Sequence, residues 1–111
     1  MAKGNNKIKK LVNKLVKSLA DKEIPAKRLI LYGSYARGNQ AFDSDIDIAV
    51  ISSAFEGKGI LERQELLGEA FFGIGEPIEA LGYTPKECRK PASLSFLHEI
   101  ISTGKLIYQK R

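Results

Sequence analysis

Two aspartates, Asp45 and Asp47, stand one residue apart at the start of an apolar, β-branched segment over residues 46–51. Because side chains alternate across a strand, both carboxylates should point to one face, with Cβ atoms roughly 6.5–7 Å apart. Two like charges beside an apolar strand are costly, and a bound cation offsets that cost. Carboxylate oxygens suit Mg²⁺, which keeps several waters and completes its shell with substrate phosphate. The pair therefore predicts a divalent-metal site.

A Gly-Ser turn comes before the aspartates, at the end of an earlier apolar segment over residues 28–32. Gly33 lets the backbone bend and approach a ligand, while Ser34 offers a hydroxyl beside exposed backbone N–H groups. Arg37 adds a forked donor suited to the same phosphate oxygens. A phosphate-holding turn and metal-binding carboxylates on neighbouring strands predict chemistry on a nucleotide phosphate.

Two other motifs share part of this pattern, and the sequence excludes both. A calcium loop starting at Asp43 would need Gly where Ile48 stands and Glu where Ala54 stands. A P-loop starting at Gly33 would need Lys and Ser or Thr at Asn39 and Gln40.

A purely structural interpretation, in which the glycine and serine form an ordinary turn and the aspartates cap a loop, is also disfavoured. It fails at Asp47, which sits inside an apolar strand where a loop-capping role cannot reach.

The elements needed to position these residues can be predicted from periodicity. Apolar residues at helical spacing predict an amphipathic helix over about residues 7–19, and a second helix over 59–74. Strands are expected at 28–32, 46–51 and 77–83, with a final edge strand at 105–108. Thr84 opens a capping box for a short helix, and Ser93 is expected to cap a last helix that Gly104 ends. The fold class is therefore α/β (α+β), with a small mixed sheet flanked by helices.

Composition and length set further limits. With 111 residues and 43% hydrophobic residues, the chain fits one domain over residues 1–111. A single Cys88 and a single His98 exclude a disulfide and a Cys/His zinc cluster, and both are interpreted as structural residues. No apolar stretch predicts a signal peptide or a membrane span, and a cytoplasmic location is expected.

Charge is concentrated at the N-terminal end of the chain. Residues 1–28 carry a net charge of +7 and the remainder −2. Such a face attracts polyanions in some proteins, but no aromatic residues interleave these lysines, so a solvated helix face is favoured over nucleic-acid binding.

The strongest motif, spread over residues 29–51, is similar to a known family signature. Gly33-Ser34, ten residues, then Asp45-Ile46-Asp47 resembles the signature of the DNA polymerase beta-like nucleotidyltransferase superfamily, and the fuller string resembles its minimal nucleotidyltransferase (MNT) domain proteins. The resemblance implies the polymerase beta-like palm fold. It also implies that Asp45 and Asp47 bind two Mg²⁺ ions, and that Gly33 and Ser34 hold the triphosphate of ATP or another nucleoside triphosphate.

In this family a later strand supplies a third carboxylate, usually an aspartate. Glu79 occupies the corresponding place and is the predicted third catalytic and metal-binding residue, one methylene longer than the usual aspartate. Glu76, before Pro77, is the reserve candidate. The alternative interpretation is that Glu79 is simply an exposed strand residue.

The resemblance also implies a partner and a reaction. It implies an antitoxin of a HEPN/MNT pair that transfers AMP from ATP to a tyrosine of a HEPN-domain toxin. The alternative is a noncatalytic antitoxin that neutralises the HEPN partner by complex formation. Because a chain of this length leaves little for a second domain, a partner is expected to complete the site, and self-association stays open.

Overall fold

The computed structural model describes residues 2–33 and 45–110, which form a four-stranded mixed sheet flanked by helices. Ser34 and Arg37 lie outside the described residues. The elements, in chain order, are α1 (Ala2–Asp21), β1 (Arg28–Tyr32), β2 (Ile46–Ile51), the short 3₁₀ helix η1 (Ser53–Phe55), α3 (Ile60–Phe71), β3 (Ile78–Tyr83), α4 (Pro85–Arg89), α5 (Phe96–Thr103) and β4 (Lys105–Gln109). Among these helices, none combines the length and apolarity needed to cross a membrane.

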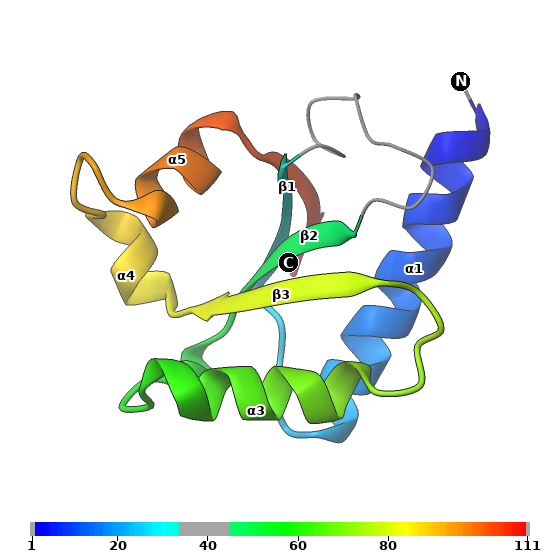
Figure 1. Ribbon diagram of the computed structural model, residues 1–111, viewed down its shortest axis with the longest axis horizontal. Helices are drawn as coiled ribbons and strands as arrows, with labels where there is room; N and C mark the ends of the chain where they lie inside the picture. Colours follow the sequence, from blue (N-terminus) through cyan, green and yellow to red (C-terminus); the bar gives the residue numbers. More distant parts are fainter. Residues whose placement is uncertain (1, 34–44, 111) are drawn as a thin grey trace.

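The strand order in the sheet is β3-β2-β1-β4. The β1 strand is antiparallel to both β2 and β4, whereas β2 and β3 are parallel because α3 carries the chain back between them. Figure 1 shows α1 and α3 on one side of the sheet and α4 and α5 on the other. The predicted mixed sheet between helices is confirmed, including the bounds of β1 and β2.

The apolar side chains form one core on each face of the sheet. On the first face, α1 and α3 pack against even-numbered residues of β2 such as Ile48 and Val50, both fully buried. On the opposite face, α5 contributes Leu97 and Ile100, which pack with Ala49 and its neighbours. Burial on both faces explains why β2 is an unbroken apolar run apart from Asp47.

The helices differ from the prediction in their bounds, because α1 already begins at Ala2 and α3 ends at Phe71, and in two further details. The last helix is capped by Ser95, not Ser93, because the Ser95 hydroxyl accepts the backbone N–H of His98 at 3.1 Å. Leu94 therefore precedes the helix and is 98% exposed instead of belonging to an apolar stripe.

The second difference lies at the start of α3. Ile60 and Leu61 fit the apolar side of the helical pattern over residues 59–74, but they are about four-fifths exposed. The buried positions of this helix include Leu67 and Ala70, and Arg63 lies one turn before Leu67 on the same side. The polar side chain of Arg63 therefore faces inward at the start of the helix, where the apolar pattern places Ile60 and Leu61.

Candidate active site

The turn at the end of β1 is in close contact with the carboxylate of Asp47. Gly33 has a φ of +73°, a conformation that favours glycine over every residue with a Cβ atom. A Cβ atom on Gly33 would overlap Asp47 Oδ2 and come within 3.2 Å of its Cγ. Glycine is therefore required twice here, by its backbone angle and by the carboxylate against it.

The sheet register aligns Asp47 with one residue on each neighbouring strand. Tyr32 of β1 is its antiparallel partner and Glu79 of β3 its parallel partner. Residues paired across adjacent strands point to the same face, so these three side chains form one row. Glu79, which the family resemblance suggested as the third carboxylate, thus lies beside Asp47. It is also exposed, as the alternative interpretation expected, so its role stays a prediction.

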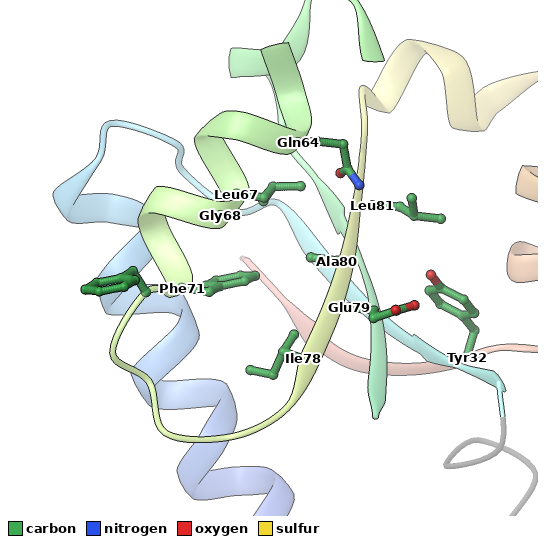
Figure 2. Close-up of a pocket in the computed structure, with 10 residues that line it drawn as sticks. Tyr32, Gln64, Leu67, Gly68, Phe71, Ile78, Glu79, Ala80 and Leu81 are labelled. Atoms are coloured by element: carbon green, nitrogen blue, oxygen red, sulfur yellow. The ribbon is translucent and has the colours of Figure 1, made fainter. Parts of the chain in front are cut away.

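Tyr32 reports the electrostatics of this row. Its pKa is raised well above the usual value, first because the side chain is partly buried and then because the Asp47 carboxylate, Tyr83 when ionised and the Glu79 carboxylate disfavour the phenolate. Figure 2 shows the Tyr32 hydroxyl turned toward the Glu79 carboxylate. Tyr32 therefore stays a neutral phenol, able to donate a hydrogen bond, throughout the physiological pH range.

The row lies on the face of the sheet that α4 and α5 cover, next to the residues that these helices bury. The Phe96 ring, at the first turn of α5, meets Tyr32 edge-on with centroids 5.6 Å apart and an interplanar angle of 85°. Phe96 remains 52% exposed, and Asp47 is half-buried. An aromatic pair thus borders one side of the carboxylates, and solvent reaches the other.

A groove of about 430 Å³ runs along β3 next to the row. Its lining includes Tyr32 and Glu79 from one face of the sheet, and Gln64, Leu67 and Phe71 of α3 from the other (Figure 2). The groove therefore wraps around the edge of β3 and includes the Glu79 carboxylate.

Several predicted site residues can be placed only in part. Asp45 immediately precedes β2 and is exposed, whereas Ser34 and Arg37 fall within residues 34–44, which are not described. Within the described ranges, no three acidic, His or Cys side chains are grouped closely enough to hold one ion. The structure brings Asp47 and Glu79 into register but does not gather Asp45 with them into a metal cluster.

The donor set nevertheless fits Mg²⁺ by its chemistry. Asp47 and Glu79 offer only carboxylate oxygens, the ligands of hard divalent cations, on a face open to solvent. Neighbouring carboxylates on adjacent strands repel each other, so a bound cation would relieve that repulsion. Glu76, the reserve candidate, instead pairs with Lys7 of α1 at 3.8 Å and lies outside the strand.

Sequence reasoning left two residues of this region unassigned. Tyr32 directly precedes Gly33, but only the register between β1 and β2 shows that it lies opposite Asp47. Phe96 follows the Ser95 cap as the first residue of α5, and only the folded arrangement shows that its ring contacts Tyr32.

Comparison with known families gives one match covering most of the chain. The family model described as "Polymerase beta, Nucleotidyltransferase" matches residues 13–111. A protein of Methanocaldococcus jannaschii, named as a candidate protein adenylyltransferase, is 29% identical over 82 residues, which are 74% of this chain and 78% of that protein.

Solved structures agree on the fold. A candidate nucleotidyltransferase from Sulfolobus solfataricus has a TM-score of 0.69 at 16% identity, covering 98% of this chain and 86% of its own. A toxin-antitoxin structure with AMP-PNP has a TM-score of 0.61 at 26% identity, covering 89% of this chain and 73% of its own. A mutant of the toxin-antitoxin pair MntA-HpeT has a TM-score of 0.58 at 23% identity over the same shares.

Proposed function

This chain belongs to the polymerase beta nucleotidyltransferase family, and we propose that it uses Mg²⁺ to transfer AMP from ATP to a tyrosine hydroxyl of a HEPN-domain toxin, thereby acting as the antitoxin. The observation that carries the proposal is the alignment of Asp47 with Glu79 on an open face of the sheet, directly against the turn at Gly33. These are the positions at which a nucleotide phosphate and its cation can be held together.

The chain's own residues divide the work. Asp45, Asp47 and Glu79 would hold the cations. Gly33, which lies against the Asp47 carboxylate, and Ser34, the next residue in the sequence, would hold the triphosphate. Two Mg²⁺ ions, when bound, supply charge neutralisation for the triphosphate and lower the pKa of the acceptor hydroxyl. Arg37 is proposed to pair with phosphate oxygens.

The choice of ATP and of a protein acceptor is supported by two relatives. The M. jannaschii relative is named for adenylyl transfer to protein, and a fold neighbour at 26% identity is a toxin-antitoxin structure with AMP-PNP. Transfer to a protein hydroxyl also suits a site whose open side ends in a groove along a strand, since a protein segment can enter it from outside.

One assay tests the activity directly. The chain is incubated with Mg²⁺, ATP labelled at the α-phosphate, and the HEPN-domain protein that the tagged chain captures. We expect covalent label on that protein, and none when the label is on the γ-phosphate. Asp45→Ala and Asp47→Ala should each lower transfer at least 100-fold with an unchanged circular dichroism spectrum, because each removes a ligand for the cations.

The matched control is Asp21→Ala, which removes an aspartate that is exposed on α1 and pairs only loosely with Lys17 at 3.8 Å. It should transfer label at the normal rate. Tight complex formation without label on the partner would support the noncatalytic antitoxin instead, and full activity in both site variants would refute the assignment of the aspartates.

A further inference from the structure

The hydrogen bonds between β2 and β3 determine which backbone groups of β3 are left at its outer edge. The Pro77 carbonyl accepts the N–H of Ile46 at 2.7 Å, and the Tyr83 carbonyl accepts the N–H of Ser52 at 2.9 Å. In a parallel pair, alternate residues direct both backbone groups to the same neighbour. The backbone N–H and C=O groups of the odd-numbered residues of β3 therefore bond to β2. The backbone groups of the even-numbered residues point away from β2, toward the outer edge.

The backbone groups at the outer edge belong to Ile78, Ala80 and Gly82, and β3 ends the described sheet on this side. Arg63 of α3 donates to the Gly82 carbonyl at 3.1 Å, which closes the C-terminal end of the edge. The backbone groups of Ile78 and Ala80 thus form the part of the edge that a further strand could pair with.

The two edges of the sheet differ in how they are protected. The β4 edge has lysines at both ends, Lys105 and Lys110, and a register irregularity opposite Leu29 and Ile30. These features discourage pairing with another chain. The β3 edge pairs with β2 over six residues without a register shift, and the range 78–83 contains neither lysine nor proline. Of the two edges of the described sheet, the β3 edge is therefore the one suited to strand addition.

The surroundings of this edge suit an extended segment with basic residues. The groove wraps around β3, so side chains alternating to both faces of an added strand would find room. Beyond its rim, a second hollow is lined by Glu65 and Glu69 of α3 together with Lys22, next to a Phe72 side chain that is 91% exposed. With Glu79 at the other side, the groove has an acidic border.

The β3 edge lies next to the carboxylates of the candidate active site, so a strand added there would place a side chain beside them. A residue paired opposite Glu79 would point to the same face as Glu79 and Asp47. Neighbouring strands lie roughly 4.8 Å apart, and aromatic side chains reach across to diagonal neighbours. A tyrosine at that position would extend its hydroxyl over the row of carboxylates.

We propose that the protein acceptor binds by adding an extended, basic segment as a strand on the β3 edge, with its tyrosine opposite Glu79. This inference rests on the proposed function and adds how the acceptor is recognised: backbone pairing sets the register, and the register selects the hydroxyl. In the transfer, the phenolic oxygen bonds to the α-phosphorus of ATP, the bond to the β-phosphate oxygen breaks, pyrophosphate leaves, and the phenolic proton passes to solvent.

The first test uses the full chain and an acetylated, amidated peptide, Lys-Val-Thr-Tyr-Thr-Val-Lys, as the probe. Ala80→Pro removes the outward N–H of β3 while leaving the bonds to β2 in place, since proline is tolerated at sheet edges. We expect it to lower label transfer to the tyrosine at least tenfold. Gln109→Pro is the matched control, because its neighbour Lys110 donates to the Lys27 carbonyl and the Gln109 N–H therefore faces away from β1.

The second test modifies only the peptide, so it does not depend on how a variant folds. N-methylation of alternate residues along one edge of the peptide should abolish labelling, whereas N-methylation along the other edge should not. With the unmodified peptide bound, amide hydrogen exchange should slow at least tenfold at Ile78 and Ala80 and stay unchanged in β4. Slowed exchange at high protein concentration without peptide would show that a second copy occupies the edge, and would overturn the proposal.

The results separate this inference from the proposed function. Strand addition is overturned, and the transferase left intact, if Ala80→Pro and the unmodified chain transfer label equally to the peptide or to a protein acceptor. Equal labelling of both N-methylated peptides has the same meaning. Failure to label the peptide and protein acceptors, with no pyrophosphate released, overturns the proposed function and the inference with it.

Discussion

Gly33→Ala should damage both stability and activity, and its two effects can be separated. Alanine at a φ of +73° costs roughly 1–2 kcal/mol of folding stability, because its Cβ atom crowds the following carbonyl oxygen. The same Cβ atom would overlap Asp47 Oδ2, so the carboxylate must move away from the turn. Since a misplacement of about 1 Å can cost roughly 100-fold in rate, we expect a loss of that order in nucleotide transfer.

Gly57→Ala is the control that isolates the second effect. Gly57 has a φ of +78°, and nothing lies within 4 Å of a Cβ atom built on it. It should lose the same roughly 1–2 kcal/mol in urea unfolding, which corresponds to about 4–8 °C in melting temperature for a domain of this size. Its transfer rate should remain normal. Equal transfer rates for the two variants would refute the idea that Gly33 positions the Asp47 carboxylate.

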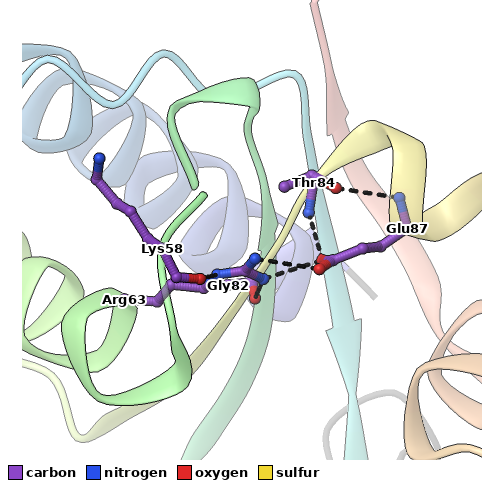
Figure 3. A network of polar contacts seen from close by, with 5 residues as sticks. All are labelled: Lys58, Arg63, Gly82, Thr84 and Glu87. Carbon is purple, nitrogen blue, oxygen red and sulfur yellow. Dashed lines mark hydrogen bonds and ion pairs between the residues drawn. The ribbon is translucent and has the colours of Figure 1, made fainter. Parts of the chain in front are cut away.

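Three further substitutions test the contacts that Arg63, Gly82 and Glu87 make (Figure 3). Arg63→Ala should cost roughly 1–3 kcal/mol in urea unfolding, because it removes the bidentate contact to the partly exposed Glu87 and hydrogen bonds to two carbonyls. The Arg63 hydrogen bond lowers the pKa of Glu87 below its ordinary 4.5, so the stability that the ionised Glu87 contributes is complete above pH 4.5 and is lost as pH falls through the lowered pKa. Glu87→Gln should therefore weaken the loss of folding stability at acidic pH, measured by urea unfolding. An unchanged acid dependence would contradict this account. Gly82→Ala should cost roughly 1–3 kcal/mol, because its Cβ atom would lie 2.7 Å from the buried Phe55 ring, and wild-type unfolding would show that the ring can move.

The strands could be predicted because their signal is local. Residues 28–32 and 46–51 are short apolar runs that end at turn residues, and the structure has strands at these positions. The capping box at Thr84 was equally visible, and both of its hydrogen bonds are present. Each of these features depends on residues only a few positions apart, so the chain specifies them without reference to the rest of the fold.

The inward position of Arg63 could not be predicted, because its partners are distant in the sequence. Its guanidinium contacts Glu87, Gly82 and the Phe55 ring, up to 24 residues away. An arginine at helical spacing before Leu67 is usually assigned to solvent, and the apolar Ile60 and Leu61 to the core. Only the folded arrangement shows that the arginine is satisfied by these partners and that the two apolar residues remain exposed.

The placement of Glu79 depends on the family resemblance, on the topology of the sheet and on packing in the core. The family resemblance suggested a third carboxylate on a later strand, and the helix between β2 and β3 implied that the two strands are parallel. Neither fixes the register, and a shift by one residue would turn Glu79 to the opposite face, against α3. The register is fixed instead by packing: Ile78 and Ala80 face the core that α1 and α3 build, which requires Glu79 to share the face of Asp47. Burial on one side of the strand therefore positions the charge on the other.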